Sequence, residues 1–322
     1  MEITTVAVLG GSGFVGRHVC HALAAKGYRV RVATRDRERA KEHLILLPTA
    51  EVAVVDVHEP AQLAEFVSGT DAVINLVGVL HDGRGERGFQ AAHVDLARKV
   101  VAACRDRGVR RLLHMSSLGA GPDAPSDYLR TKGEAEAIVR DAGLASTIFR
   151  PSVIFGPDDS FLNLFAQALK LLPAMALGSP GARFQPVFVE DVAAAFVKAL
   201  ADLGSHGKRY DLCGPRVYTL RELVEFTAAT TGRRRPIIGL NDGLSYLQAL
   251  VMEWMPVKLL TRDNYYSMKV DSVCDCPFPF GITPAALEAV APAWLGPVTP
   301  RARYQQYRSQ VRRYNDSVTG DR

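Results

Sequence analysis

Tyr128 and Lys132 are the residues of this chain best suited to acid–base chemistry. They stand in the segment SDYLRTKGEAEAIV, which is typical of a helix begun by Ser126 or Asp127. A separation of four residues places both side chains on one face of that helix. A neighbouring ammonium group lowers the pKa of a phenol from about 10 toward the range in which it can exchange a proton with a substrate. We therefore expect Lys132 to tune Tyr128 as a proton donor or acceptor.

Two serines end the strand that is predicted immediately before this helix. Ser116 and Ser117 follow the predicted strand Arg111–Met115. A hydroxyl at that strand end can hold a substrate carbonyl or carbinol beside the phenol. The predicted catalytic residues are therefore Ser117, Tyr128 and Lys132, and a cofactor is expected to contact Ser116, Tyr128 and Lys132. A Tyr-x-x-x-Lys spacing alone can arise by chance in a chain with ten tyrosines, so the strand-to-helix context carries this prediction.

A glycine-rich turn near the start of the chain predicts a phosphate-binding loop. The segment VAVLGGSGFVG, residues 6–16, places Gly10, Gly13 and Gly16 between an apolar strand and a helical pattern. The first glycine permits a tight turn, the second lets a pyrophosphate approach bare backbone, and the third lets helix and strand pack closely. An ordinary glycine-rich turn is the alternative, but the flanking strand and helix favour phosphates at the helix N-terminus. The residues expected to contact a dinucleotide here are Gly10, Ser12, Gly13, Phe14, Val15 and Gly16.

The end of the second predicted strand bears on the choice between NAD(H) and NADP(H). Enzymes that use NAD usually place an acidic residue there to bind the ribose hydroxyls. This chain has Thr34 followed by Arg35, and a guanidinium suits a 2′-phosphate. We therefore expect NADP(H) to be favoured over NAD(H). Asp36 is the counterargument, because a shift of one residue would put its carboxylate on the ribose. Arg37 and Arg39 are expected on a solvated helix face.

Two further strand ends are expected to touch the cofactor. Asp56 and Val57 close the third strand, where the adenine would lie. Asn75, Val77 and Gly78 end the fourth strand, and a glycine there lets the chain pass close to the ribose and pyrophosphate. The alternative at both places is an ordinary strand-to-loop turn.

The elements that must position these residues alternate through the first half of the chain. Apolar runs with few polar interruptions are typical of strands buried on both faces of a parallel sheet. Strands are predicted at 5–9, 29–33, 51–55, 72–76, 111–115 and 146–149, with helices such as 13–25 and 90–107 between them. Later elements are expected at 159–172 (helix), 184–189 (strand), 191–201 (helix), 209–212 (strand) and 219–231 (helix with a Thr cap).

This pattern predicts an α/β protein with a Rossmann, doubly wound parallel sheet and a smaller C-terminal substrate lobe. The dinucleotide-binding domain is expected to span residues 1–155, with 184–213 returning to it. Residues 156–183 and 214–300 are assigned to the smaller lobe, and residues 301–322 form a basic tail.

The segment from Tyr128 to Phe165 resembles a particular branch of the short-chain dehydrogenase/reductase superfamily. Its marks are Tyr-Leu-Arg-x-Lys, then Arg-Pro-Ser-x-Ile-Phe-Gly, then Asp-x-Phe-Leu-Asn. These are similar to atypical, epimerase/dehydratase-like members related to the NAD(P)H-binding accessory subunit of respiratory complex I and its free-standing bacterial relatives. The resemblance implies an NADP(H)-binding fold in which Pro151 and Ser152 lie beside the nicotinamide. In that family the mitochondrial member binds NADPH and is regarded as structural.

The chain departs from the wider family in two ways. The segment between Ser117 and Tyr128 is short, so the loop that usually serves sugar nucleotides is reduced. His93 occupies a place where such enzymes commonly carry an Asn that supports proton relay, which counts against full turnover.

The net charge bears on the kind of binding partner, and the cysteine content bears on the cellular compartment. The formal charge of +5 is modest and dispersed, so no nucleic-acid partner is expected. Cys20, Cys104 and Cys213 fall in apolar segments and are expected to be buried thiols. Cys274 and Cys276 have no companion cluster, so no metal site is predicted. These features fit a reducing, cytoplasmic compartment.

Two C-terminal features suggest a partner. Residues 301–322 contain six arginines and are expected to be either a solvated tail or a basic contact with anionic lipid or an acidic subunit. A wide apolar helical face is most simply core, but it could line an apolar substrate pocket or lie at a membrane interface; its residues are Leu244, Leu247, Leu250, Val251, Trp254 and Met255. A peripheral contact with the inner membrane or a respiratory complex is therefore one interpretation of these two features, beside a solvated tail and a core helix.

Two principal function classes follow. In the first, the chain is an NADP(H)-dependent oxidoreductase that acts on an apolar, quinone-like substrate. In the second, it is a non-catalytic NADPH-binding structural or assembly protein of a respiratory membrane complex. A sugar-nucleotide epimerase or dehydratase is a further alternative. The sequence does not name the substrate.

Overall fold

The structure is a computed structural model of the chain and describes residues 3–44, 47–83, 85, 88–254 and 260–296. The predicted basic tail 301–322 and Met255 of the predicted apolar face lie outside these residues. In the described part of the chain, no helix combines the length and the apolar character needed to cross a membrane.

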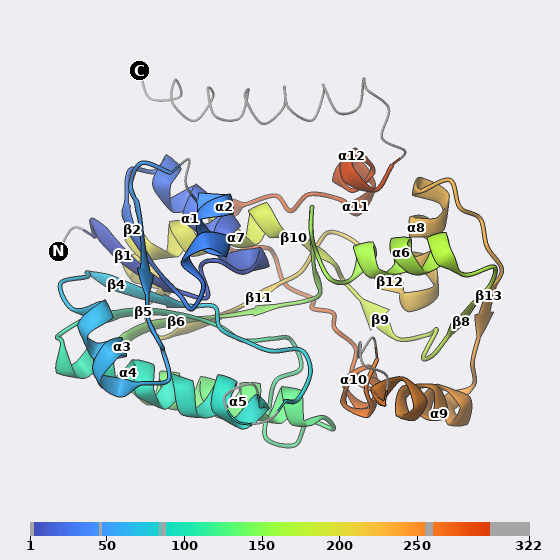
Figure 1. Cartoon of the computed structure of the whole chain (residues 1–322), viewed down its shortest axis with the longest axis horizontal. Coiled ribbons are helices and arrows are strands. Elements are labelled where there is room, and N and C mark those ends of the chain that lie inside the picture. Colours follow the sequence, from blue (N-terminus) through green and yellow to red (C-terminus); the bar gives the residue numbers. More distant parts are fainter. Residues whose placement is uncertain (1–2, 45–46, 84, 86–87, 255–259, 297–322) are drawn as a thin grey trace.

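A seven-stranded parallel sheet forms the larger part of the molecule (Figure 1). Its strand order is β11-β6-β5-β4-β1-β2-β3, so the order reverses between β1 and β4. Ligands of such sheets bind beyond the carboxyl ends of the strands at this switch point. The predicted α/β, Rossmann-like class is confirmed. The strands are β1 (Thr5–Leu9), β2 (Arg29–Thr34), β3 (Ala50–Val54), β4 (Ala72–Asn75), β5 (Arg111–Met115), β6 (Ala145–Pro151) and β11 (Lys208–Leu212).

Helices cover both faces of this sheet. Val6 and Val8 of β1 belong to one hydrophobic core, and Ala7 and Leu9 of the same strand belong to the other. Because both faces of β1 are buried, this strand is apolar from Val6 to Leu9. The first face carries α1 (Phe14–Ala25), α2 (Arg37–Leu44) and α7 (Val189–Ala201); the second carries α3 (Pro60–Val67), α4 (Leu96–Asp106) and α5 (Asp127–Arg140) (Figure 1).

Two predicted elements differ in detail. The expected strand 184–189 is wrong, because the structure has two short strands, β9 (Arg183–Phe184) and β10 (Val187–Phe188), and α7 already begins at Val189. Pro186 lacks an N–H group, which prevents continuous pairing there. The expected helix 90–107 begins as a π-helix, η2 (Gln90–Asp95), before α4.

A smaller lobe packs beside the carboxyl ends of the strands (Figure 1). Its own core combines Leu169, Met175, Leu177, Leu220, Val224 and Ala228. The predicted Thr cap is confirmed at Thr219, which forms a capping box with Glu222. The remaining elements of the chain are β7 (Ile154–Phe155), α6 (Leu162–Leu171), β8 (Met175–Leu177), η3 (Leu203–Ser205), β12 (Tyr218–Thr219), α8 (Leu220–Thr230), β13 (Ile237–Gly239), α9 (Asp242–Glu253), α10 (Arg262–Ser267), η4 (Pro279–Gly281), α11 (Leu287–Val290) and α12 (Pro292–Leu295). Of these, η3 lies beside the sheet, and Leu287 of α11 and Leu295 of α12 join the first core of the sheet.

The expectation that the apolar face of α9 is core is wrong. The buried residues of this helix are Ser245 and Ala249, whereas Leu244, Leu247, Val251 and the following Trp254 are exposed. The helix lies close to Gly178, where an added Cβ would come within 3.5 Å of the Ser245 Cβ and 2.7 Å of the Gln248 Oε1. Periodicity shows that a helix has an apolar stripe, but it does not show which side meets the protein.

Candidate functional site

The glycine loop after β1 is folded tightly on itself. Gly10 has a φ of +78°, and a Cβ there would lie 3.2 Å from the backbone of Leu76 and Val77 beyond β4. A Cβ on Gly16 would fall 2.1 Å from the carbonyl oxygen of Gly10. Both positions therefore require glycine to bring the loop, α1 and the end of β4 together.

Gly13 leaves an open approach to the start of α1. It is exposed, and an added Cβ would meet only the Gly10 carbonyl oxygen, at 3.2 Å. As the N-cap of α1 it contributes no side-chain bond to the N–H groups of the first turn. This arrangement fits a pyrophosphate, which binds bare backbone and the positive end of a helix dipole.

The other predicted residues of the loop differ in what they can offer. The Val15 side chain is buried in the core, so only its backbone can face a nucleotide. Phe14 opens α1, and its ring would lie 3.2 Å from a Cβ on Gly156. Ser12 is half-buried beside exposed Gly13.

The ends of β2 and β3 lie along the same edge of the sheet. Arg35 is exposed directly after β2, and Arg37 is exposed at the start of α2. The Thr34 hydroxyl accepts a bond from the Asp36 N–H at 3.2 Å and donates to the Asp36 carbonyl at 3.0 Å, which fixes the turn that follows.

Beyond β3, one of the two residues expected to contact adenine, Asp56, forms a hydrogen bond within its own turn. The Asp56 carboxylate accepts a bond from the His58 N–H at 2.9 Å. Val57 packs partly against the second core.

The end of β4 is organised by a buried amide. Asn75 Oδ1 accepts a bond from the Val77 N–H at 3.1 Å, and its Nδ2 lies 3.3 Å from His114 Nδ1. Asn75 therefore shapes the turn that leads to Gly78. A Cβ on Gly78 would lie 3.0 Å from Lys132 Nζ, so this strand end passes close to the lysine.

The structure brings the predicted catalytic residues together. The Ser117 hydroxyl lies close enough to the Tyr128 phenol to shift its pKa, and its Oγ donates to the Leu118 carbonyl oxygen at 3.2 Å. Lys132 is buried one helical turn further along α5, and its Nζ donates to the Met115 carbonyl oxygen at 3.1 Å. The neighbouring Ser116 Oγ is buried and has no hydrogen-bond partner among the described residues, so it is available to a bound group.

The pKa shifts of Tyr128 and Lys132 differ from those expected from the sequence. Burial raises the pKa of Tyr128, the nearby Ser117 hydroxyl opposes this rise, and the Asp263 carboxylate adds to it. The predicted lowering of the Tyr128 pKa by Lys132 is therefore wrong for this structure, because burial dominates the shift and the other contributions come from Ser117 and Asp263. Burial also lowers the pKa of Lys132 to about 8, with Glu136 opposing. Tyr128 is held as a protonated phenol, which suits a proton donor.

Three interactions hold α5 in place. Ser126 caps the helix by accepting a bond from the Leu129 N–H at 3.2 Å. Arg150 of β6 forms a two-pronged ion pair with buried Glu136, at 2.6 Å for each bond. A Cβ on Gly133 would lie 2.6 Å from the Gly121 nitrogen, so only glycine fits at this close approach. The Arg of the Arg-Pro-Ser signature is thus an anchor for the helix that carries the site.

Asp263 is a residue at the site that the sequence did not reveal. This α10 carboxylate accepts bonds from the backbone N–H groups of Asp127 at 2.7 Å and Tyr128 at 3.4 Å. An acidic group at a helix N-terminus is favourable. Asp263 lies well over a hundred residues from Tyr128 along the chain, and no local pattern marks it.

His93 occupies η2 beside the catalytic pair. Its Nε2 accepts a bond from the Val79 N–H at 3.3 Å, and its ring meets the Tyr128 ring edge-to-face at 5.5 Å. Burial, together with the charges of Lys132 and His114, lowers the pKa of His93 to about 2. The imidazole is therefore neutral, and it joins the end of β4 to α5.

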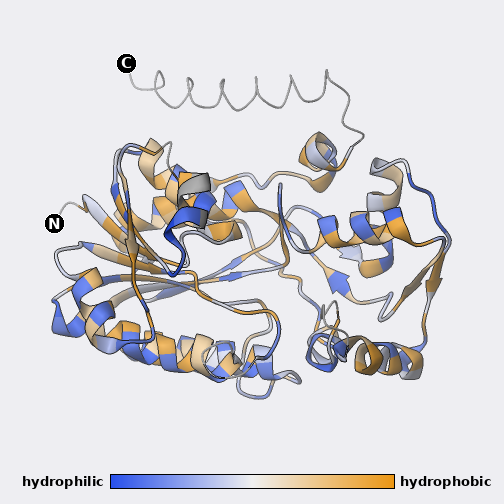
Figure 2. Ribbon diagram, in the orientation of Figure 1, coloured by the Kyte–Doolittle hydropathy of each residue, from blue (hydrophilic) through white to orange (hydrophobic). Residues whose placement is uncertain are grey.

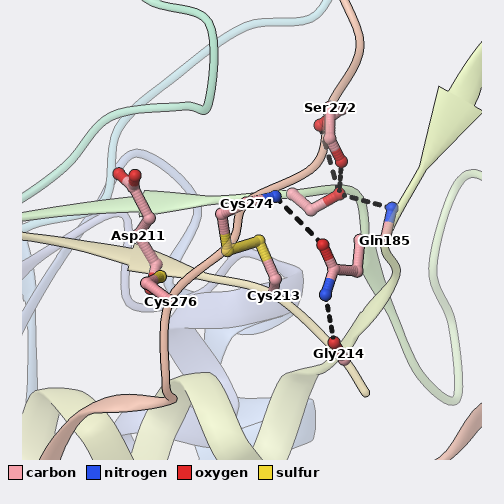
Figure 3. Close-up of a disulfide and its surroundings, with 8 residues drawn as sticks. Gln185, Asp211, Cys213, Gly214, Ser272, Cys274 and Cys276 are labelled. Carbon is pink, nitrogen blue, oxygen red and sulfur yellow. Dashed lines mark hydrogen bonds between the residues drawn. A yellow bond between two sulfur atoms is a disulfide. The ribbon is translucent and has the colours of Figure 1, made fainter. Parts of the chain in front are cut away.

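A segment of the smaller lobe, residues 272–274, lies against the carboxyl end of β6; we call this segment the strap (Figure 3). Pro151 ends the strand, and the Ser152 Oγ donates to the Ser272 carbonyl oxygen at 2.7 Å. Gln185 joins the same network by accepting a bond from the Cys274 N–H at 3.0 Å and donating to the Gly214 carbonyl oxygen at 2.8 Å.

A disulfide joins Cys213, at the end of β11, to Cys274 in this strap. The expectation of a buried thiol at Cys213 is therefore wrong, and the argument from unpaired cysteines for a reducing compartment loses its basis. The two cysteines are 61 residues apart, so no spacing in the sequence indicated the pair. Cys20 and Cys104 are buried thiols, as predicted, and Cys276 is an exposed one. Within the described ranges, no group of three or more His, Cys, Asp or Glu side chains could hold a metal ion.

Fold and site together define a dinucleotide-binding protein of the short-chain dehydrogenase/reductase type. More specifically, the chain belongs to the NAD dependent epimerase/dehydratase family, which matches residues 6–213. This confirms the resemblance proposed from the sequence.

Two relatives illustrate the range of the family. The chain is 36% identical over 226 residues to subunit 9 of the mitochondrial NADH dehydrogenase (ubiquinone) 1 alpha subcomplex of Arabidopsis thaliana, covering 68% of this chain and 56% of the relative. It is 32% identical over 262 residues to a ceramide reductase of Caulobacter vibrioides, covering 77% of this chain and 78% of the relative. The match spans 56% of the Arabidopsis thaliana subunit and 61% of its Mus musculus counterpart, which is less than two thirds of either relative.

The solved structures show the same fold. UDP-glucuronic acid 4-epimerase of Bacillus cereus, in complex with UDP-glucuronic acid and NAD, superposes with a TM-score of 0.64 at 17% identity. The match covers 83% of this chain and 99% of the epimerase. At this identity the likeness concerns the fold alone.

Proposed function

We propose that the protein is an NADP(H)-dependent reductase of a carbonyl group on an apolar substrate. The observation that carries the proposal is the placement of the Tyr128 phenol near Ser117, with Lys132 buried one turn further along the same helix, α5. Asp263, Glu136 and the Ser126 cap hold this constellation. Proton transfer in a reductase requires the proton donor to be held in place before the substrate binds, as these contacts hold Tyr128.

The chemistry follows from the protonation states. When bound, the reduced nicotinamide supplies a hydride to the carbonyl carbon. Ser117 orients the carbonyl oxygen, and Tyr128 gives that oxygen its phenolic proton, so that hydride and proton together yield the alcohol. Lys132, charged below its pKa of about 8, stabilises the phenolate that is left and can hold the nicotinamide ribose.

The preference for NADP(H) rests on Arg35. Its exposed guanidinium follows β2 where the adenosine ribose lies in this fold class, and it can bond a 2′-phosphate in a forked manner. The backbone of Asp36 is fixed by Thr34, which defines the turn from which Arg35 extends.

An apolar substrate is supported by the ceramide reductase relative, to which the chain is similar over most of both lengths. A quinone-like substrate belongs to the same class, since a quinone also offers a carbonyl on an apolar molecule. A sugar-nucleotide epimerase is less well supported, because the segment between Ser117 and Tyr128 is short.

A second function is favoured by a different observation. The mitochondrial relatives are subunits of NADH dehydrogenase, and His93 stands where catalytic members commonly carry Asn. On this alternative the chain binds NADPH without turnover and supports a respiratory membrane complex.

One experiment separates the two functions. Purified protein is analysed for bound nicotinamide nucleotide and then mixed with NADPH and a panel of quinones, long-chain ketones and sugar nucleotides. NADPH oxidation with an apolar carbonyl supports the reductase. Strong stabilisation by NADPH with no oxidation on the whole panel supports the structural alternative.

A further inference from the structure

Three of the five cysteines of the chain meet at one place beside the candidate site. Cys213 and Cys274 form the disulfide, and Cys276 is a free, exposed thiol two residues further along the chain (Figure 3). Cys213 is buried, whereas Cys274 is half-buried, so a small thiol can approach the disulfide from the Cys274 side. Disulfides that are exposed to thiols are the ones that are reduced and re-formed in regulation.

A single segment of the smaller lobe, residues 261–274, contacts the helix that carries the predicted catalytic residues. It consists of α10 and the chain that leads from α10 into the strap. Asp263 accepts bonds from the first backbone N–H groups of α5. The Ser267 Oγ donates at 2.8 Å to the Oγ of Ser126, the residue that caps α5. Both contacts lie at the start of α5, directly beside Tyr128.

The same segment then passes the neighbouring strand ends of the site. A Cβ on Gly119 would lie 3.2 Å from Val270 Cγ1, so the segment runs close to the loop that follows Ser117. Further along, the Ser272 carbonyl oxygen accepts the bond from the Ser152 Oγ at 2.7 Å. Ser152 is the residue expected beside the nicotinamide. The position of this segment therefore bears on the proton donor and on the predicted cofactor site together.

The segment 261–274 is held mainly by polar contacts and by the disulfide. Helix α10 has the sequence Arg-Asp-Asn-Tyr-Tyr-Ser with no aliphatic side chain, and it lies on the hydrophilic side of the scale in Figure 2. Met268 packs against the core of the smaller lobe. At the other end, the Cys274 N–H donates to Gln185 Oε1 at 3.0 Å, and the Cys274 Sγ is bonded to Cys213 at the end of β11. The disulfide thus ties this segment covalently to the sheet.

We propose that the Cys213–Cys274 disulfide is a reversible redox latch of the site. When the disulfide is formed, it fixes the segment 261–274 against α5 and β6. When the disulfide is reduced, the segment loosens, and the site holds its cofactor and its proton donor less firmly. The effect on NADPH binding and turnover rests on the proposed function, whereas the effect on the mobility of the segment does not.

The latch opens by thiol–disulfide exchange with a dithiol. A thiolate of the dithiol attacks the Cys274 Sγ, the bond between the two protein sulfur atoms breaks, and Cys213 leaves as a thiolate that takes up a proton. The second thiol of the dithiol then attacks the mixed disulfide, which releases the Cys274 thiol and forms a cyclic disulfide. The protein disulfide thereby gains two electrons and two protons, and the dithiol loses them. The reverse steps, with a small disulfide as the oxidant, close the latch.

The neighbouring Cys276 thiol is a poor competitor in this exchange. Partial burial, together with the carboxylates of Asp211 and Asp275, raises the pKa of Cys276. Because the thiolate is the attacking species, a raised pKa lowers the fraction of Cys276 that can attack the disulfide. Cys276 therefore leaves the existing pairing unchanged.

The test compares oxidised full-length protein with protein that has been reduced by dithiothreitol, both without cofactor or substrate. Alkylation after denaturation should count three thiols before reduction and five after it. Deuterium exchange followed by mass spectrometry should become about tenfold faster in residues 126–130 and 261–274 after reduction, because the amides of Asp127 and Cys274 lose fixed partners. Re-oxidation with a small disulfide should restore the slow exchange.

Cys274→Ser and Cys276→Ser form a matched pair, because each removes one sulfur atom from the same stretch of chain. Cys274→Ser should exchange like reduced wild type under both conditions, and Cys276→Ser should switch as wild type does. NADPH affinity, measured by nicotinamide fluorescence, should fall about threefold or more on reduction and in Cys274→Ser, because binding must then order the segment again. Circular dichroism of every sample shows whether the fold is intact.

The proposal is overturned if dithiothreitol opens the disulfide only together with unfolding, since the disulfide is then purely structural. It is also overturned if the disulfide opens while exchange in residues 126–130 or the affinity for NADPH stays as in the oxidised protein. Equal behaviour of the two serine variants would likewise overturn it. An oxidised wild type that binds no NADPH contradicts the proposed function instead, and the exchange rates still decide whether the latch exists.

Discussion

The Nδ1 atom of His93 lies 2.9 Å from the Oγ1 atom of Thr131, across the space between η2 and α5. Because the Nε2 atom of the same ring accepts a bond from the Val79 N–H, the proton of the neutral imidazole must reside on Nδ1 and be donated to Thr131. The Thr131 hydroxyl in turn donates to backbone carbonyl groups of α5. His93 therefore links the strand end that faces the cofactor to the helix that carries Tyr128 and Lys132, and it is a positioning residue.

Buried neutral histidines predict a loss of stability in mild acid. Burial lowers the pKa of His93 to about 2 and that of His114 to about 3, with Lys132 acting in the same direction. Below an unfolded-state pKa of about 6.5, the unfolded chain binds protons that the folded chain does not, so stability falls as pH falls. Each histidine contributes about 1.4 kcal/mol per pH unit between about pH 6 and pH 5. Urea unfolding measured across this range gives the slope.

The variant His114→Leu isolates one of these contributions. Whatever it does to stability at neutral pH, it should make the slope shallower by about 1.4 kcal/mol per pH unit, because one titrating group is gone. An unchanged slope would show that His114 is not buried in its neutral form.

Gly13 and Gly16 should respond differently to the same change. Gly16→Val would drive a side chain into the Gly10 backbone, so we expect loss of folded protein. Gly13→Val meets only one carbonyl oxygen, so the fold should survive while the methyl groups occupy the place of the pyrophosphate. Titration by nicotinamide fluorescence, beside circular dichroism, checks both. A folded Gly13→Val protein with wild-type affinity would refute the phosphate-binding loop.

Arg35→Ala tests the choice of cofactor. NADPH binding should weaken by about 1.5–3 kcal/mol, the range for losing hydrogen bonds to a charged group, and NADH binding should hardly change. Arg37→Ala is the control, because Arg37 is also an exposed arginine and is expected on the solvated face of α2. Calorimetric titration with both nucleotides gives the comparison. Equal losses for the two nucleotides would remove the support for NADP(H).

The pKa of Lys132 predicts how kcat/KM for the reduction falls at alkaline pH. A lysine is charged below its pKa, and burial places the pKa of Lys132 at about 8. The kcat/KM for reduction should therefore fall as the pH rises through about 8, since the phenolate left on Tyr128 loses its neighbouring charge. Lys132→Met should be slow at every pH and should lack this limb. A wild-type profile that stays level well above pH 8 would contradict the assignment.

The sheet was predictable from the sequence because its strands are buried on both faces. Runs such as Thr5–Leu9 and Ala72–Asn75 carry mostly apolar residues on both faces of the sheet, so their bounds are visible without any partner. The site was predictable where its residues lie close along the chain, as with Tyr128, Lys132 and the glycine loop.

The features that escaped prediction depend on contacts between distant residues. Asp263 reaches the start of α5 from the smaller lobe, and the Cys213–Cys274 disulfide closes a long loop. The raised pKa of Tyr128 is a property of burial, which the four-residue spacing to Lys132 does not report. The apolar face of α9 was assigned to the core because periodicity does not tell which face of a helix is covered.

The measurement that tests the central claim most directly is stopped-flow NADPH oxidation by wild type and Tyr128→Phe with a long-chain ketone or a quinone. A phenyl ring fills the same space but cannot give a proton, so we predict NADPH affinity within a few-fold of wild type and turnover lowered by about 10²–10⁴-fold. Turnover in Tyr128→Phe equal to wild type would contradict the proposed proton donor. A wild type that oxidises NADPH with none of these substrates, although NADPH raises its melting temperature, would contradict the reductase and favour the structural alternative.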